Sequence, residues 1–300
     1  MIPAMPDPWR TPQTQRRAPK PLLPAHAKAL FQVLADRRPR RNRLALLLAL
    51  CLPALAGMAA AYEPADVVLH QPGTLPLVLT APHDGDQPLG LTPVRNQGTR
   101  LRDIGTAALT EQVAQRLQAR LGQRPCVVVA RFSRRFLDAN RPEADALESD
   151  SALPAYRAYH AAVADCVAQA QARHPQGALL VDVHGQGQAS DTLFRGTRAG
   201  LTTRSLLARH GPAALQGPQS LIGLLAAKGY TVHPAVGAAS LAEDPRFAGG
   251  HTVATYGSQQ AGGIDAIQLE FGLQQRQSPQ LADDLADALA VFLRGHGYLP

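Results

Sequence analysis

Residues 178–185 read ALLVDVHG, and this stretch decides the fold. Its first six residues contain a single polar side chain, that of Asp182, so both faces of the segment are apolar. Residues 127–130, VVVA, show the same property. Strands that are apolar on both faces are typical of a sheet that helices cover on both sides. The two segments therefore predict a three-layer α/β fold.

The remaining chain from residue 62 onward supports this layout, because short apolar runs alternate with amphipathic stretches. We expect strands at 66–70, 76–82, 126–132, 178–185, 230–234, 251–257 and 264–272. We expect helices at 103–122, 153–174, 217–229 and 278–297, and a short helix near 202–211 within a loop-rich segment that spans 185–216. The excursion at 234–250 is long enough to line a site. The sequence predicts a single α/β/α domain over 62–300 with a mixed, largely parallel sheet.

The first 61 residues read as an export segment. A prefix rich in proline and arginine precedes an apolar run at 44–61, which closes on small residues. This order is typical of a secretory signal peptide, with cleavage after Ala61. An uncleaved membrane anchor is the alternative, because the run approaches the ~20 residues that span a bilayer. We expect the mature protein to be periplasmic or secreted, or else anchored in the inner membrane.

The positive charge of the chain belongs to that segment. Residues 1–62 carry ten Lys and Arg against two Asp and Glu, whereas residues 63–300 carry twenty against twenty-one. The mature part is therefore near neutral, which argues against a nucleic-acid partner. It retains Cys126 and Cys166. In an oxidising compartment they could pair, but we expect two separate buried thiols.

Polar groups end three of the expected strands. His83 and Asp86 follow the strand at 76–82, His184 ends the strand at 178–185, and Glu270 lies near the end of 264–272. Ligands gather at the carboxyl ends of strands in open α/β sheets. Two imidazoles and a carboxylate are the protein ligands of a catalytic zinc ion, which leaves one position for water.

This set predicts a site for one zinc ion held by His83, Asp86 and His184, with Glu270 as the general base. A bound zinc ion lowers the pKa of its water and polarises a carbonyl, and a carboxylate can accept the proton. Gly85 permits the bend between His83 and Asp86. Asp84 is a rival for the third ligand position. Each residue alone also has an ordinary structural explanation, as a hydrogen-bond or ion-pair partner.

The segment ARFSRRFLDANRP at 130–142 places four arginines between apolar residues. Guanidinium groups bind carboxylates through two parallel hydrogen bonds, and one such group can also stabilise an oxyanion. A basic surface with two aromatic anchors is the structural alternative. The composition of the segment leaves these options open.

Four ordered motifs resemble the N-formylglutamate amidohydrolase family. They are PHDGD (82–86), SRRFLDANRP (133–142), LLVDVHGQG (179–187) and the pair GGHTVATYG (249–257) and GGIDAIQLEFG (262–272). The resemblance extends over roughly residues 65–297. It implies a zinc hydrolase related in fold to carboxypeptidase A and aspartoacylase.

The resemblance also implies roles for individual residues. The metal motif of the family falls on His83, Asp86 and His184, and its base falls on Glu270. The arginine that polarises the scissile carbonyl in this fold group corresponds to Arg134. The pair that binds the carboxylate of the substrate corresponds to Asn140 and Arg141, and Arg195 is a candidate for a further substrate contact.

These residues together predict a metal-dependent hydrolase that cleaves an amide bond of a small N-acyl amino acid or related carboxylate. Two alternatives remain open from the sequence. One is a metallocarboxypeptidase-like enzyme that acts on peptidoglycan stem peptides. The other is a non-catalytic periplasmic binding protein on the same fold.

Overall fold

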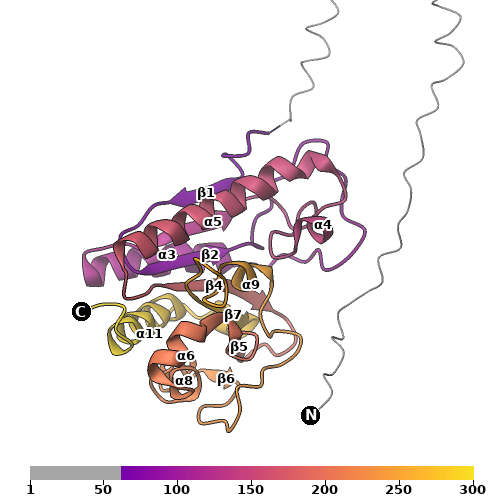
Figure 1. Cartoon of the computed structure of the whole chain (residues 1–300). Coiled ribbons are helices and arrows are strands. Elements are labelled where there is room, and N and C mark those ends of the chain that lie inside the picture. Colours follow the sequence, from indigo (N-terminus) through magenta and orange to yellow (C-terminus); the bar gives the residue numbers. More distant parts are fainter. Residues whose placement is uncertain (1–61) are drawn as a thin grey trace, which may run out of the picture. The chain divides into compact units, whose positions relative to one another are not determined.

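The computed structural model describes residues 62–300, and the predicted signal peptide at 1–61 lies outside them. Within the described residues the centre of the fold is a seven-stranded sheet in the order β1-β3-β2-β4-β7-β5-β6 (Figure 1). The strands are β1 (Val68–Gln71), β2 (Leu77–Ala81), β3 (Cys126–Ala130), β4 (Leu179–Gln186), β5 (Thr192–Gly196), β6 (Thr231–His233) and β7 (Asp265–Gly272).

The sheet is mixed and mostly parallel, as the sequence predicts. Strands β3, β2, β4 and β7 run parallel to one another, whereas β1 pairs antiparallel with β3 and β5 pairs antiparallel with β7. The longest pairing joins β4 to β7 over eight residues and places His184 directly opposite Glu270. Two predicted site residues from distant parts of the chain therefore lie side by side.

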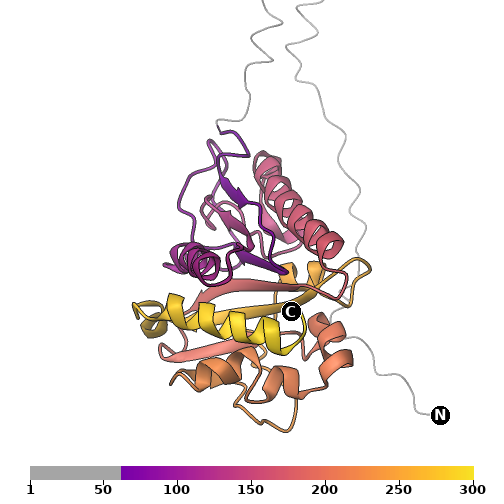
Figure 2. The same ribbon diagram turned by 90° about the vertical axis from the view of Figure 1, so that its left-hand side faces the viewer.

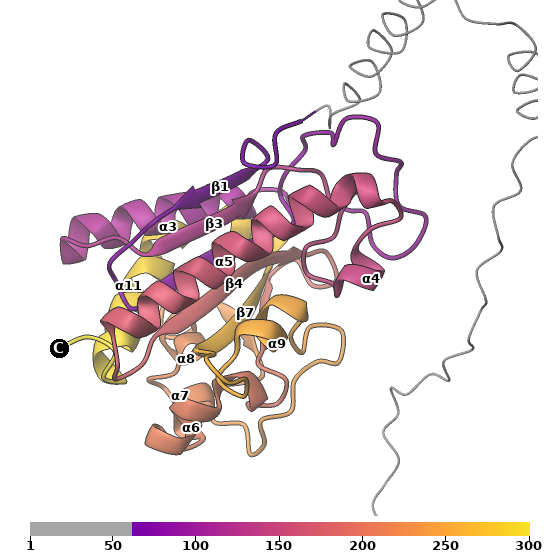
Figure 3. The same ribbon diagram turned by 45° about the horizontal axis from the view of Figure 1, so that its top comes forward.

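Helices cover both faces of the sheet (Figures 2 and 3). One face carries α3 (Thr106–Leu121), α11 (Leu281–Gly295) and the shorter α6 (Arg204–His210), α7 (Ala213–Gln216) and α8 (Leu221–Ala226). The other carries α5 (Leu153–Arg173) and α9 (His251–Tyr256). Two single-turn helices, α4 (Glu143–Ala146) and α10 (Leu273–Arg276), complete the α-helices among the described residues.

The alternation of side chains along each strand feeds two separate cores. In β4, Leu179 and Val181 pack with α3 and α11, whereas Leu180 packs with α5. Successive side chains of a strand point to opposite faces, so a strand between two helical layers must be apolar on both. This requirement explains the continuous apolar pattern of residues 178–183.

Two segments form another type of structure than the sequence predicts, and the short helices α4, α7 and α10 were not predicted. Residues 251–257, predicted as a strand, form the short helix α9. The β-branched residues of HTVATY favour a strand, but tertiary contacts override this preference. Val253 is buried in the core on this face of the sheet, and the Thr252 amide donates to Asn140 Oδ1 at 2.8 Å. Residues 192–196, predicted as loop, form strand β5 beside β7.

The cysteine prediction is wrong. Cys126 at the start of β3 and Cys166 on α5 form a disulfide, with their Cα atoms 5.8 Å apart. The helix packs directly on the strand at this point, so the two side chains face each other.

Among residues 62–300, no helix has both the length and the apolar character needed to cross a bilayer.

Candidate metal centre

Three of the predicted site residues, His83, His184 and Glu270, meet at the carboxyl edge of the parallel strands. His83 lies two residues beyond the end of β2. His184 and Glu270 lie near the carboxyl ends of β4 and β7. Because β2, β4 and β7 are parallel and adjacent or nearly adjacent, their carboxyl ends share one edge of the sheet. The sheet topology thus brings His83 next to His184, which lies 101 positions further along the chain.

A third side chain, that of Asp103, completes a tight triangle with the two histidines. His83 Nδ1 lies 3.1 Å from His184 Nδ1. Asp103 Oδ2 lies 3.3 Å from each of these nitrogens. All three residues are buried, with at most 6% of their surface exposed. Three potential ligand atoms therefore converge on one point.

Two further carboxylates orient the imidazoles. His83 Nε2 lies 2.7 Å from Asp138 Oδ1, and His184 Nε2 lies 2.8 Å from Asp182 Oδ2. Thr80 donates to the other oxygen of Asp182. An ionised carboxylate only accepts hydrogen bonds, so each Nε2 carries the hydrogen. Each Nδ1 then presents a lone pair to the centre, the arrangement that histidine ligands of metals adopt.

This donor set fits a zinc ion. Zinc–nitrogen and zinc–oxygen distances of about 2.0–2.2 Å in a tetrahedron place neighbouring ligand atoms about 3.3–3.5 Å apart. The three observed separations, 3.1, 3.3 and 3.3 Å, come close to this range. Three lone-pair donors face one another in a buried space, so a cation there satisfies all of them at once.

The electrostatics of the cluster favour positive charge at the centre. Burial opposes ionisation of Asp103, but His184 and His83, which donate from Nδ1 when their imidazoles are protonated, outweigh it and lower the pKa of the carboxyl. Burial likewise opposes a charge on His184, yet Asp182 and Glu270 raise the pKa of its imidazole well above the usual value. A bound cation would take the place of that proton.

Backbone contacts hold Asp103 in position. Its amide donates to the His83 carbonyl at 3.1 Å, and its Oδ2 accepts from the Gly185 amide, also at 3.1 Å. Its own carbonyl accepts from the hydroxyl of Thr106, the first residue of α3. The turn that precedes α3 is therefore fastened to the segments that carry both histidines.

The structure does not bring Asp86 or Asp84 to the histidine pair. The side chain of Asp86 is 72% exposed and forms an ion pair with Arg102. Asp84 is buried, but its carboxylate accepts from the amides of Gly105 and Ala107. It thus satisfies the free amides at the start of α3. Asp103 occupies the place that the sequence assigned to Asp86.

Close packing, rather than a bend that only glycine adopts, explains Gly85. A Cβ atom at this position would lie 2.3 Å from the backbone of Arg131 and Phe132. Gln87 forms a bridge to Phe132 next to this contact. The chain after His83 therefore runs against the 130–132 segment, and this course carries Asp86 to the surface.

Glu270 lies beside the triangle, as its proposed role requires. Its Oε1 is 4.0 Å from His184 Nδ1 and accepts from Gln268 Nε2 at 2.9 Å. Burial raises the pKa of the Glu270 carboxyl, which the neighbouring His184 partly offsets. A raised pKa brings a carboxylate closer to the range in which it exchanges protons near neutral pH.

Arg134 also reaches the cluster, and Arg141 borders it. Arg134 donates to Asp138 Oδ2 at 3.0 Å and lies 3.5 Å from Asp103 Oδ1. Arg141 lies 3.9 Å from Asp138 Oδ2, and its side chain is 55% exposed. Arg134 is thus held inside the site, whereas the guanidinium of Arg141 is open to solvent and to ligands.

Asn140 is a buried member of the same cluster. Its Nδ2 lies 3.3 Å from His184 Nε2 and donates to Gln268 Oε1 at 3.4 Å. Its Oδ1 accepts from the Thr252 amide. A Cβ atom at Gly250 would collide with the Asn140 side chain at 2.3 Å. Asn140 therefore links β7 and α9 to the site.

Arg195 lies elsewhere, in a buried ion pair. Its Nε donates to Glu243 Oε1 at 2.9 Å, and the side chains of both residues are at most 2% exposed. Glu243 also accepts from the amide and hydroxyl of Thr197. The structure thus places Arg195 as an anchor for the 234–250 excursion and not among the residues around His83.

The sequence did not reveal the roles of Asp103, Asp138 and Asp182. Asp103 is the first residue of the helix predicted at 103–122, and acids at a helix start usually stabilise that end, which hid its other contact. Asp182 is a charged residue within an otherwise apolar strand, a pattern that does signal a specific buried partner. Asp138 stands in the arginine segment with no periodic pattern around it, and its role became visible only in three dimensions.

Comparisons with known proteins bear on the family resemblance and on the fold. The family model of N-formylglutamate amidohydrolase matches residues 151–275, which include His184 and Glu270. A crystal structure of N-formylglutamate amidohydrolase from Ralstonia eutropha has a TM-score of 0.52 at 19% identity, covering 77% of this chain and 98% of that one. The structure of a gene product from Agrobacterium tumefaciens has a TM-score of 0.50 at 14% identity, covering 78% and 95%.

A search of curated proteins finds no match. At these identities the two solved structures establish the shared α/β fold. The family match over residues 151–275 confirms the predicted resemblance of this chain to the N-formylglutamate amidohydrolase family.

Proposed function

We propose that this protein is a zinc-dependent hydrolase that cleaves an amide bond of a small N-acyl amino acid or a related carboxylate. The observation that carries the proposal is the triangle of His83 Nδ1, His184 Nδ1 and Asp103 Oδ2 beside a buried Glu270. The match to the N-formylglutamate amidohydrolase family supports the type of bond.

His83, Asp103 and His184 would hold the zinc ion in this proposal. The ion, when bound, supplies a Lewis acid and lowers the pKa of a water molecule. Asp138 and Asp182 keep both imidazoles in the tautomer that leaves Nδ1 free to bind. Loss of such partners typically weakens metal binding 10- to 100-fold.

The remaining residues transfer the proton and bind the substrate. Glu270 accepts a proton from the attacking water and returns it to the leaving nitrogen. The guanidinium of Arg134 donates to the oxyanion that forms on the substrate carbonyl. The exposed guanidinium of Arg141 binds the carboxylate of the substrate. Asn140 donates to Gln268, which in turn donates to Glu270 and holds that carboxylate in place.

We also propose that the protein acts outside the cytoplasm, after cleavage of the predicted signal peptide. The disulfide between Cys126 and Cys166 supports this location. Disulfides persist in the periplasm and in secreted proteins and are rare in the reducing cytosol. An N-terminus of the mature protein at Tyr62 is the expected result of protein sequencing.

Measurement of the bound metal and a screen of substrates test the proposed activity. We expect about one zinc ion per chain at this site, and turnover of N-acyl amino acids that stops when a chelator removes the metal. Activity confined to peptidoglycan stem peptides would favour the carboxypeptidase-like alternative. Full activity in metal-free protein would contradict the mechanism.

Glu270→Gln separates an enzyme from a binding protein. We expect this variant to retain zinc and to lose about 10²- to 10⁴-fold in turnover, because the general base is gone. Glu111→Gln is the matched control, since Glu111 lies on α3 and, among residues 62–300, its recorded ion pair is with Arg131 at 3.4 Å, away from the histidines. Ligand binding without turnover in the unaltered protein would favour the binding protein.

A further inference from the structure

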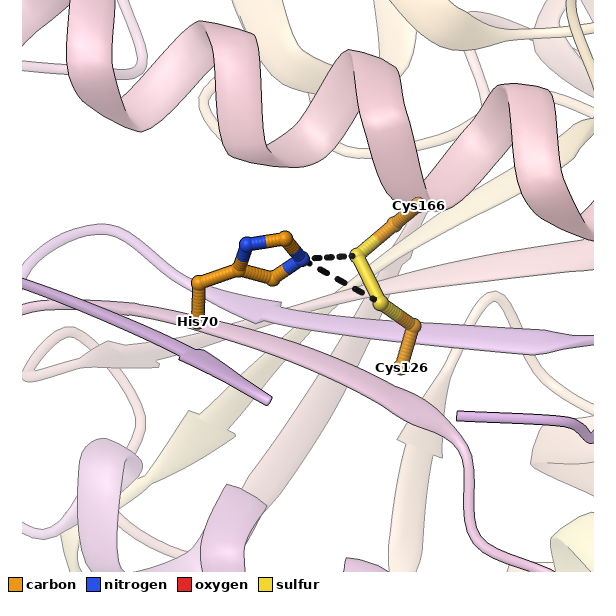
Figure 4. A group of neighbouring side chains, drawn as sticks. All are labelled: His70, Cys126 and Cys166. Carbon is orange, nitrogen blue, oxygen red and sulfur yellow. Dashed lines mark hydrogen bonds between the residues drawn. A yellow bond between two sulfur atoms is a disulfide. The ribbon is translucent and has the colours of Figure 1, made fainter. Parts of the chain in front are cut away.

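A second cluster of metal-ligating side chains lies away from the site described above. It comprises His70 on β1, Cys126 at the start of β3 and Cys166 on α5 (Figure 4). Cys126 begins β3, whereas His83 follows the end of the parallel neighbour β2. The two clusters therefore belong to opposite edges of the sheet, and no residue is common to them.

The imidazole of His70 faces the disulfide. Its Nε2 lies 3.5 Å from Cys166 Sγ and 3.8 Å from Cys126 Sγ, and Figure 4 shows this nitrogen pointed at both sulfur atoms. Asp165 Oδ2 lies 3.7 Å from the same nitrogen, between the two sulfur distances. Two sulfurs and one carboxylate oxygen therefore lie within 3.8 Å of His70 Nε2.

We propose that His70, Cys126 and Cys166 bind one thiophilic divalent cation, such as Zn²⁺, when the disulfide is reduced. Zinc–sulfur distances of about 2.3 Å and zinc–nitrogen distances of about 2.0–2.1 Å give a nitrogen–sulfur separation of about 3.6 Å in a tetrahedron. The two observed separations lie on either side of this value. His70 is already in place, and only the two sulfurs must move apart.

Reduction of the disulfide requires an external reductant. A dithiol or phosphine gives two electrons to the disulfide, the S–S bond breaks, and each sulfur takes up one proton. The cation then displaces both protons and binds two thiolates. The fourth position falls to Asp165, which is adjacent to Cys166, or to water.

The surroundings allow the cation to enter and give it a structural effect. The side chain of His70 is 31% exposed, so this ligand is open to solvent while both cysteines are buried. The disulfide links β3 to α5, and the cation would link both of these to β1 as well. The edge of the sheet would then stay joined to α5 in either redox state.

Cobalt binding to the full chain tests the proposal. Co²⁺ bound to thiolates gives a near-ultraviolet charge-transfer band, which the nitrogen and oxygen ligands of the His83 centre cannot produce. We expect no such band in the oxidised protein. After reduction with a phosphine, we expect the band together with one additional equivalent of bound Co²⁺.

Variants assign the ligands. His70→Ala should weaken this Co²⁺ binding at least 10-fold, whereas His174→Ala, at the end of α5, should not. Cys126→Ser with Cys166→Ser should abolish the band, and persistence of the band would assign it to Cys51 and overturn the proposal. Equal Co²⁺ affinity in His70→Ala would overturn it also.

Circular dichroism shows whether the reduced protein keeps its fold. If the reduced protein stays folded and shows no charge-transfer band, the proposal is overturned. If reduction unfolds the protein, restoration of the native spectrum by Co²⁺ supports the proposal, and failure to restore it overturns it. None of these results depends on amide hydrolysis, so the proposed function stands or falls separately.

Discussion

Asp103 supplies the carboxylate beside His83 and His184, although the spacing in the sequence favoured Asp86 for that position. His83 and Asp86 have the spacing of a paired metal motif, but the chain after His83 packs against Arg131 and Phe132. This course directs Asp86 to solvent and Asp84 to the start of α3. The carboxylate that reaches the two imidazoles comes from twenty residues downstream.

Metal affinity should therefore depend on Asp103 and not on Asp86. We expect Asp103→Ala to lower zinc affinity at least 10-fold, because one of three ligands is lost, and Asp86→Ala to leave it unchanged. Competition with a chromogenic chelator measures both affinities. The reverse ranking of the two variants would restore Asp86 as the ligand.

At the scale of elements, the buried pair of Arg195 and Glu243 joins strand β5 to the 234–250 excursion. Arg195 also donates to the carbonyls of Leu215 and Leu241. Burial lowers the pKa of Arg195, while Glu243 acts in the opposite direction. A charge in this position is tolerable only because its partner and several acceptors surround it.

Removal of one partner should be costly. We expect Arg195→Met to lower the free energy of unfolding by about 3–5 kcal/mol, because Glu243 then remains buried without its counter-charge. Denaturation by urea measures the change. The double variant with Glu243→Gln should recover part of the loss, and Arg246→Met, in the exposed pair with Asp244, serves as the control that should change little. An unchanged free energy of unfolding in Arg195→Met would show that the pair of Arg195 and Glu243 does not stabilise the fold.

At the scale of the whole molecule, His160 lies where three segments meet. It belongs to α5, its Nε2 contacts the Ala139 carbonyl at 3.0 Å, and its Nδ1 contacts the Tyr256 hydroxyl of α9 at 3.0 Å. Burial lowers the pKa of His160 to about 4, and His251 adds to the effect. These contacts give His160 a structural role at the junction of the three segments.

Stability should fall in acid because of this residue. Between pH 6.5 and pH 4 the unfolded chain takes up a proton on His160 that the folded protein does not, so the free energy of unfolding decreases as the pH falls. The full effect is about 3 kcal/mol at 1.36 kcal/mol per pKa unit. Unfolding curves of the unaltered protein and of His160→Gln at pH 7, 5.5 and 4 measure it. A stability difference that stays constant over this range would contradict the prediction.

The residue pattern alone predicted the sheet and most of its helices, because apolar periodicity reports directly which faces are buried. It also identified His83, His184 and Glu270, since polar groups at strand ends stand out against apolar runs. Residues 251–257 and 192–196 were assigned incorrectly because tertiary contacts, not local preference, decide short elements.

Tertiary structure alone decided which carboxylate lies against His83 and His184, which groups hydrogen-bond the imidazoles, and which cysteines pair. Each of these is a contact between segments distant in the chain, such as Asp103 with His184 or Cys126 with Cys166. Local sequence records which side chains are unusual where they stand, but it does not record which of them meet. The order and direction of the strands determine that, and they follow from the packing of the whole domain.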